Sequence, residues 1–220
     1  MSSGTRGPLL HRIYKAYLVD QNTTAFSDNV RKRYTIGTLE RIAQSGDRMA
    51  RRAAILALSG LADYESNAVM GRALHDNDRG VRMLAENGIR SLWCRVGDPA
   101  QRKALQAIID LNKQRRFESA VKKAGKLIAH APWLAETWNQ RALAFFSQKK
   151  YSESIRDCNQ ALEINPYHFG AATGMAQSYL RLGNRPAALE CFQRALQLNP
   201  NLEGVRAQVH HLRRMLKRQE

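Results

Sequence analysis

Apolar residues recur every three or four positions through most of the chain, which is the spacing of amphipathic helices. Residues 9–19 show this spacing first, and the polar stretches 20–28 and 96–101 interrupt it. Near the end of the chain, a further series of apolar residues three or four apart runs from Leu202 to Leu216. No segment alternates apolar and polar residues with a period of two, so the sequence predicts an all-helical fold without strands.

Prolines mark a repeat in the second half of the chain. Pro132, Pro166 and Pro200 are separated by intervals of 34 residues, and each follows a similar apolar stretch. An aromatic residue, Phe117 or Tyr151, stands 15 residues before each of the first two prolines and directly after a basic turn. Each unit therefore holds two helices around a polar turn and ends at a proline that stops the second helix. Because one such hairpin cannot bury its apolar face alone, the sequence predicts stacked hairpins.

This spacing, together with small and large residues at fixed positions in each unit, resembles the tetratricopeptide repeat. Two units match well, 135–168 and 169–202, whereas 101–134 is a degenerate first unit with Ile108 where the family has a small residue. The resemblance implies closely packed hairpins and a C-terminal capping helix within 202–220. The matching residues are Trp138, Ala142, Phe145, Tyr151, Cys158 and Ala161 in the first of the two units and Ala172, Ala176, Tyr179, Ala188, Phe192 and Ala195 in the second.

The first hundred residues repeat with another period. Residues 47–51 and 78–82 superimpose with an offset of 31, and the apolar phase of the segments that follow them agrees. This resembles a HEAT-type helical repeat, although the usual period of that family is longer, about 40 to 47 residues. Asp47 and Asp78 are expected to cap the helices that they precede.

The two patterns together predict one continuous, right-handed helical-repeat solenoid, an α-α superhelix of HEAT-like and then tetratricopeptide hairpins. We expect an N-terminal capping helix and a linker in residues 1–28 and HEAT-like repeats in 29–99. The break at Gly97–Pro99 is expected to precede three tetratricopeptide units and the C-terminal capping helix in 101–220.

In the tetratricopeptide family, the first helix of each hairpin lines a concave groove that holds a peptide or a helix of another protein. Carried onto this chain, the resemblance implies a protein-binding adaptor with the following groove residues: Glu136, Asn139, Gln140, Leu143, Phe146, Thr173, Gln177 and Arg181. The amides of Asn139 and Gln140 can pair with both the N–H and the C=O groups of an extended chain. The alternative for these residues is an ordinary solvated surface.

One version of this groove in the family clamps a C-terminal dicarboxylate with Lys, Asn and Arg side chains. None of these types stands at the matching positions of this chain, so that specificity is not expected. The residues found there are Leu105, Ile109, Gln140, Gly170 and Gly174.

Charge supports a second hypothesis. The chain has 35 Lys and Arg against 19 Asp and Glu, a formal net charge of +16, and residues 101–220 hold 20 of the basic side chains but only nine acidic ones. A cationic surface attracts polyanions, so binding of an RNA or DNA backbone, or of an acidic protein segment, is the alternative. The basic patch is expected at Arg102, Lys103, Lys113, Arg115, Arg116, Lys122 and Lys123.

The sequence shows no constellation typical of catalysis. It lacks a glycine-rich phosphate loop and the CxxC and HExxH patterns, and the neighbouring His210 and His211 point about 100° apart on a helix, so they do not converge on a metal. We therefore expect no enzyme, no metal site and no cofactor. A weaker alternative, an enzyme of the helical-repeat lyase or glycosylase kind, rests on fold analogy alone.

Three cysteines in helical patterns are expected to be reduced thiols, with Cys158 and Cys191 as small packing residues. No apolar run approaches the roughly 20 residues that a membrane-spanning helix needs, and no secretory leader is visible. We therefore expect a cytoplasmic protein that does not insert into membranes.

Overall fold

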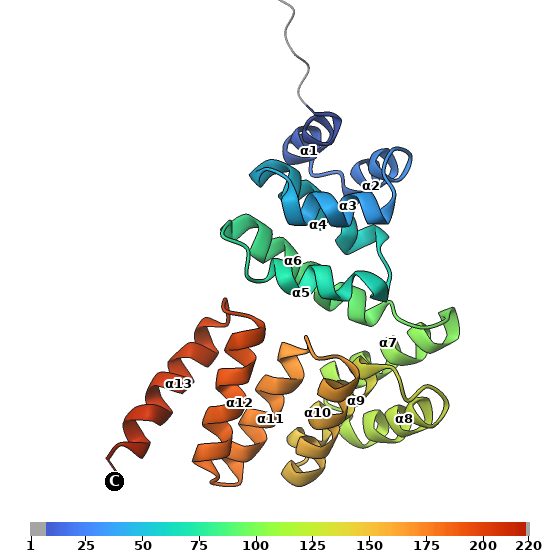
Figure 1. The fold of residues 1–220 in the computed structure, drawn as a ribbon. Helices are drawn as coiled ribbons and strands as arrows, with labels where there is room; N and C mark the ends of the chain where they lie inside the picture. The colour runs from blue at the N-terminus through green and yellow to red at the C-terminus, as the bar shows by residue number, and fades with distance from the viewer. Residues whose placement is uncertain (1–7, 219–220) are drawn as a thin grey trace, which may run out of the picture. The chain divides into compact units, whose positions relative to one another are not determined.

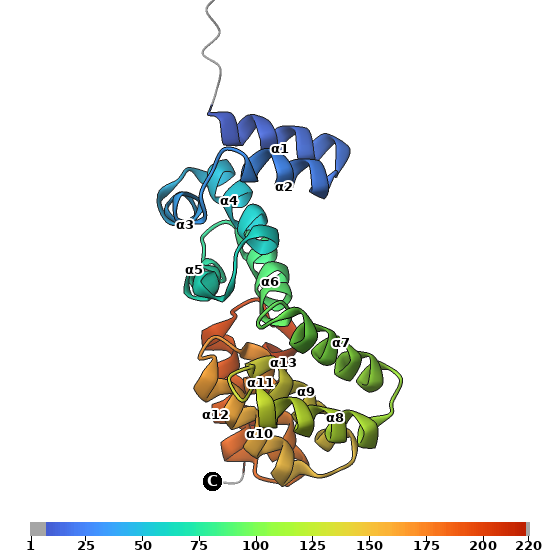
Figure 2. The same cartoon turned by 90° about the vertical axis from the view of Figure 1, so that its right-hand side faces the viewer.

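The computed structural model describes residues 8–218, which form thirteen α-helices and one short 3₁₀-helix and contain no strand (Figures 1 and 2). The prediction of an all-helical fold is therefore confirmed. The ends of the two predicted capping regions, residues 1–7 and 219–220, lie outside the described residues. The chain divides into two compact units between Leu92 and Trp93.

The N-terminal unit is built from six α-helices, the last of which runs two residues past Leu92. Helices α3 and α4 pack against each other, and α1 and α2 both contact α4. The helices are α1 (Leu9–Asp20), α2 (Thr23–Arg31), α3 (Ile36–Ser45), α4 (Arg48–Leu61), the 3₁₀-helix η1 (Tyr64–Ser66), α5 (Asn67–Ala73) and α6 (Arg79–Cys94).

Helix α2 begins at Thr23 and takes up most of the polar stretch 20–28, where the sequence predicts a linker, so this prediction is wrong. The side chain of Asn22 accepts a hydrogen bond from the backbone N–H of Ala25 at 2.9 Å, which caps the first turn. Phe26 and Val30, one turn apart, are buried on the inner face of the helix. Polar composition suggested a loop, but two apolar residues at helical spacing are enough to dock one short helix.

The offset of 31 residues is visible in the local structure of the N-terminal unit. Asp47 and Asp78 accept the backbone N–H of the residue three positions later, at 2.9 and 3.0 Å, as expected of helix caps. Arg51 and Arg82 both donate to the backbone carbonyl five residues earlier, at 3.0 and 3.2 Å. Equivalent residues therefore make equivalent hydrogen bonds, while the assignment of these segments to the HEAT type stays a prediction.

The C-terminal unit, from Trp93 onward, is a stack of antiparallel hairpins: α7 with α8, α9 with α10, and α11 with α12 (Figure 1). The first helices of neighbouring hairpins also contact one another, since α9 packs against both α7 and α11. The helices are α7 (Pro99–Lys113), α8 (Phe117–His130), α9 (Ala135–Ser147), α10 (Tyr151–Ile164), α11 (Phe169–Arg181), α12 (Arg185–Leu198) and α13 (Glu203–Leu216).

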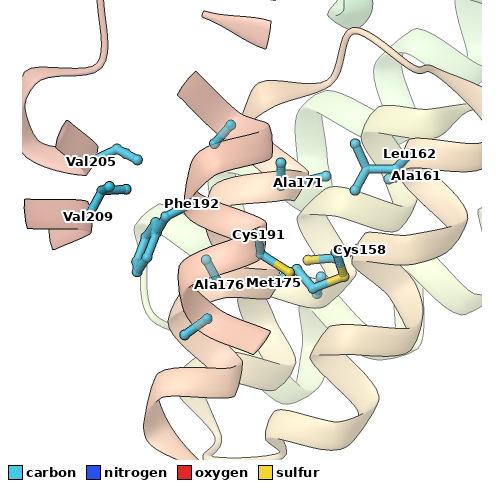
Figure 3. Close-up of a cluster of buried hydrophobic side chains, with 14 of the residues drawn as sticks. Cys158, Ala161, Leu162, Ala171, Met175, Ala176, Cys191, Phe192, Val205 and Val209 are labelled. Atoms are coloured by element: carbon cyan, nitrogen blue, oxygen red, sulfur yellow. The ribbon is translucent and has the colours of Figure 1, made fainter. Parts of the chain in front are cut away.

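Small side chains fill the contacts inside and between the hairpins. Ala142 and Ala161, both predicted as small packing positions, are fully buried in the core of the unit. Phe192 faces α13, whose Val205 and Val209 cover the last hairpin (Figure 3). Because small residues let helix axes approach closely, this packing explains why the pattern allows so few large side chains. Helix α13 closes the stack as predicted.

Two of the three cysteines lie in this core. Cys158 on α10 and Cys191 on α12 are free thiols, and both are buried beside Met175 (Figure 3). The prediction that they are small packing residues is confirmed. Burial raises the pKa of the Cys158 thiol to about 12.

The turns within the three hairpins share one backbone feature. Arg115, Lys149 and Gly183, spaced by 34 residues, all have positive φ, at 60°, 63° and 78°. This left-handed conformation is free of steric cost only for glycine. The repeat therefore imposes a conformation on Arg115 and Lys149 that neither side chain favours.

Within the described residues, no helix is both long enough and apolar enough to span a membrane.

Candidate functional site

The predicted groove residues lie on α9 and α11, the first helices of the second and third hairpins. Leu143, Gln177 and Arg181 are exposed, and Asn139, Gln140, Phe146 and Thr173 are half-buried. Glu136 is buried. The structure therefore divides the predicted set into residues that a partner can reach and residues whose side chains are already occupied.

The Glu136 carboxylate shares a hydrogen bond with His168 that links the starts of two helices. His168, the residue before α11, accepts the backbone N–H of Ala171 on its Nδ1 at 3.0 Å. The proton of the neutral ring therefore lies on Nε2, which donates to Glu136 Oε2 at 2.8 Å. Both side chains are almost fully buried. This pair ties α9 to α11 and takes Glu136 out of the set of ligand-binding candidates.

The same carboxylate accepts two further hydrogen bonds from its own helix. Gln140 Nε2 donates to Glu136 Oε1 at 2.7 Å, and Asn139 Nδ2 donates to it at 3.2 Å. Gln140 in turn accepts two hydrogen bonds from Nδ2 of Asn112 on α7, one on its side-chain Oε1 and one on its backbone carbonyl, both at 2.9 Å. The two amides predicted to read a peptide backbone are thus engaged in a network that joins α7, α9 and α11.

Opposing effects act on the pKa of the Glu136 carboxyl. Burial by itself raises this pKa, because a charge is costly away from water. The hydrogen bond from His168, followed by those from the amides of Gln140 and Asn139, outweighs burial and holds the pKa below its ordinary value. Glu136 is therefore an ionised carboxylate at neutral pH.

Trp93 covers this network. Its ring stacks on the His168 ring with a centroid separation of 4.3 Å and an interplanar angle of 19°, and it is tilted against Phe169 at 5.3 Å. Trp93 is only 4% exposed. Cys94 lies close enough for the Glu136 charge to act on it, and burial, followed by that charge, raises the pKa of its thiol to about 11. The chain itself therefore covers the start of α11.

Sequence reasoning missed Trp93 and His168. Trp93 precedes the first repeat unit, so the register of 34 residues assigns it no position. His168 closes the unit 135–168 next to a turn, where a histidine carries no strong signal of its own. Only the packed hairpins bring the two rings together.

The accessible part of the predicted groove lies toward the C-terminal ends of α9 and α11. We call Leu143, Phe146, Gln177 and Arg181 the open groove surface. Leu143 is 47% exposed, and the Arg181 guanidinium stands 6.0 Å from the centre of the Phe146 ring. Thr173 adds no free group, because its hydroxyl donates to the carbonyl of Phe169 at 2.8 Å. The open groove surface thus combines exposed apolar area with an amide and a cation.

The seven residues of the predicted basic patch are all exposed, but they lie on three parts of the first hairpin. Arg102 and Lys103 stand near the start of α7, Lys113 ends it, and about 16 Å of helix separates Arg102 from Lys113. Arg115 and Arg116 form the turn. Lys122 and Lys123 follow on α8.

Two hollows run along α10, outside the open groove surface. One has a volume of about 410 Å³ and is lined by residues that include Ile155, Met175 and Tyr179. The other, of about 340 Å³, is lined by Trp138 and Phe145 together with charged and polar side chains. Neither shares a residue with the open groove surface. Among the described residues, no group of three or more His, Cys, Asp or Glu side chains is placed to hold a metal ion.

Comparison with known proteins identifies the hairpins. The family model described as "Tetratricopeptide repeat" matches residues 135–168 and 171–202, the second and third hairpins. The C-terminal unit contains tetratricopeptide repeats. The first of these matches has the same bounds as the unit predicted from the spacing of the prolines, and the second falls within the next predicted unit.

Two curated proteins are similar to parts of this chain. A TPR repeat-containing protein of Rhizobium etli is 32% identical over 126 residues, which is 57% of this chain and 62% of that protein. The Hsp70-Hsp90 organizing protein of Triticum aestivum is 28% identical over 92 residues, 42% of this chain and 16% of that protein. The chain thus spans less than two thirds of the length of these relatives.

Among solved structures, the first TPR of Spaghetti (RPAP3), bound to the HSP90 peptide SRMEEVD, has the fold of the tetratricopeptide hairpins. It is 21% identical with a TM-score of 0.51, covering 53% of this chain and 93% of its own. This likeness concerns the fold alone.

Proposed function

We propose that this chain is a non-enzymatic adaptor that binds a segment of another protein on the open groove surface. The observation that carries the proposal is the exposure of Leu143 beside the half-buried Phe146. Both lie on the helix side for which the resemblance to the repeat implies ligand binding. An apolar side chain that covers Leu143 and Phe146 would remove their exposed area from water, which is the main source of binding energy in such contacts. Gln177 and Arg181 border this area with polar groups.

The likeness to the peptide-bound TPR of Spaghetti supports a peptide segment as the ligand of this chain, but not the same peptide. The positions where the family clamps a C-terminal dicarboxylate hold other residues here: Leu105 is buried, and Gln140 is engaged by Asn112 and Glu136. We infer that this groove does not bind the SRMEEVD peptide through such a clamp. The partner is instead chosen by the apolar contact on α9.

The chemistry of the described side chains supports a binding role over a catalytic one. Burial raises the pKa of the Cys94 thiol to about 11 and that of Cys158 to about 12, so both thiols are protonated and weakly nucleophilic at neutral pH. Glu136 and His168 are paired with each other beneath Trp93, where no substrate reaches them. We propose that the chain acts through contacts alone, without a cofactor.

The test is a selection of random 12-residue peptides on the full chain, followed by affinity measurement with the selected peptides. We expect Leu143→Glu to weaken binding at least tenfold, because a charge in an apolar contact is costly to bury. The matched control is Gln197→Glu on the exposed side of α12, which adds the same charge and leaves affinity unchanged. Equal affinities for wild type and Leu143→Glu would reject the open groove surface as the binding site.

The peptide SRMEEVD serves as the specificity control. We expect no binding of it at concentrations that saturate the chain with a selected peptide. Tight binding of SRMEEVD, lost when its C-terminal carboxylate is amidated, would contradict the inference about the clamp.

A further inference from the structure

The turns within the three hairpins meet at one edge of the C-terminal unit. Because α7, α9 and α11 run in the same direction and lie side by side, their C-terminal ends share this edge with the starts of α8, α10 and α12. The edge is rich in cations from each hairpin, and we call this set the basic edge. Its members are Lys113, Arg115, Arg116, Lys149, Lys150, Arg181 and Arg185.

The charges of the basic edge are largely uncompensated. Lys113 stands 3.9 Å from Asp110, and both side chains are exposed. None of the other six makes a salt bridge within the described part of the chain. The nearby acidic residues in sequence are Glu118 and Glu153, in the first turns of α8 and α10. Six of the seven cations are exposed and Arg185 is half-buried, and few counter-charges lie near them, so the edge attracts anionic groups.

The fold does not require these basic residues. The left-handed turn position holds Gly183 in the third hairpin, where the conformation is free of cost, but Arg115 and Lys149 in the other two. The hairpins have the same architecture with either residue type. The cations are therefore a property of the surface and not of the turn.

The basic edge is continuous with the open groove surface. Arg181 belongs to both, with its guanidinium 6.0 Å from the Phe146 ring centre. Phe146 itself leads into the second turn, where its carbonyl accepts the N–H of Lys149 at 2.9 Å. A chain anchored on Leu143 and Phe146 reaches the cations of two turns within a few residues, since an extended chain advances about 3.3 Å per residue.

We propose that the partner is an acidic protein segment, in which an apolar anchor on the open groove surface is followed by Asp or Glu residues that contact the basic edge. This inference rests on the proposed function and adds the chemical class of the ligand. Single-stranded nucleic acid fits less well, because its binding sites use exposed aromatic rings for stacking. Trp133, an exposed aromatic side chain at 55%, lies between α8 and α9, at the opposite edge.

The experiment compares peptides selected from one random 12-residue library by wild type and by a charge-reversed chain carrying Arg115→Glu, Arg116→Glu and Lys149→Glu. We expect wild type to select an apolar residue flanked by Asp and Glu, and the reversed chain to lose the acidic preference while keeping the apolar one. For an acidic peptide selected by wild type, we expect affinity to fall about tenfold or more on reversal and to fall with added salt.

Two further variants control for the change in net charge and for disruption of the fold. Reversal of Lys122, Lys123 and Lys126 on α8 changes the net charge equally, away from the turns, and we expect it to leave affinity within about twofold of wild type. The double variant Arg115→Gly with Lys149→Gly removes two charges and suits the left-handed turns, so it keeps the fold. We expect it to weaken the acidic peptide about threefold to fivefold.

The outcomes separate this inference from the proposed function. In one outcome, wild type selects peptides without acidic residues, and Leu143→Glu still abolishes their binding. That result would show that the open groove surface binds the partner but that the basic edge does not recognise acidic residues. Equal losses from the α8 reversal and the turn reversal would overturn the inference, because net charge alone would explain them. Tighter binding of an unrelated 20-base-pair RNA duplex than of any selected peptide, lost on the turn reversal, would also overturn it in favour of a nucleic-acid surface.

Discussion

Glu136 and His168, 32 residues apart in the chain, share a buried hydrogen bond of 2.8 Å that joins the start of α9 to the start of α11. His168 can make this bond and cap α11 at the same time only as a neutral ring, since its Nδ1 must stay free to accept the N–H of Ala171. The ionised Glu136 and the neutral His168 therefore define one protonation state that holds two hairpins together.

Stability is expected to depend on this carboxylate below about pH 4.5. The pKa of Glu136 is lowered in the folded chain, so its contribution is present above the pKa of the unfolded chain and is lost as the pH falls through the folded pKa. Glu136→Gln should cost about 2 to 4 kcal/mol at pH 7, because it removes one partner of a buried pair. Urea unfolding at pH 7 and pH 3.5 measures the effect, and the difference between wild type and variant should shrink at the lower pH.

Glu163→Gln is the matched control for this prediction. Glu163 also accepts two side-chain amides, those of Asn159 and Gln160, but it lies exposed on α10. We expect a change of less than about 0.5 kcal/mol at either pH. A loss at Glu136 that is equally large at both pH values would show that packing, and not the charge, explains it.

Trp93→Ala is expected to destabilise the C-terminal unit by about 3 kcal/mol or more, because a large buried side chain and its stacking on His168 are lost. Trp93→Phe should recover a large part of this loss, since it retains a ring against His168 and Phe169. Trp133→Ala, the control at an exposed ring, should cost less than about 1 kcal/mol. Denaturant titration followed by far-ultraviolet circular dichroism reports all three.

The close helix contact at Ala142 predicts severe overpacking. Ala142→Trp should destabilise the unit by about 1 to 3 kcal/mol or more, because α9 and α10 cannot separate without breaking the core around Cys158 and Ala161. The neighbouring Leu143→Trp places the same ring at an exposed position and should leave the melting temperature nearly unchanged. A similar loss from both variants would contradict the packing register of α9.

The left-handed turns predict a stabilisation. Lys149→Gly and Arg115→Gly should each raise the free energy of unfolding by about 0.5 to 1 kcal/mol, since the relief at positive φ exceeds the entropy that glycine adds to the unfolded chain. Gly183→Ala should lose about 1 kcal/mol, although an added Cβ meets no atom within 4 Å there. If none of the three variants changed the free energy of unfolding, the left-handed backbone conformation would not affect stability at these turns.

The candidate site divides into a part that the sequence predicts and a part that it does not. Leu143, Phe146, Gln177 and Arg181 follow from the repeat register and are accessible in the structure. Glu136 follows from the same register, yet its side chain is buried. A helical register fixes the direction in which a side chain leaves its helix, but not whether another segment covers it.

The sequence by itself determined the hairpins, because the spacing of Pro132, Pro166 and Pro200 and the small residues between them act within and between neighbouring helices. Local caps such as Asp47 were determined in the same way, by groups three residues apart. Only the tertiary structure decided that Trp93 stacks on His168 and that Glu136 is buried while Leu143 is exposed. Such contacts join residues far apart in the chain, and their free energy depends on packing that no periodic pattern records.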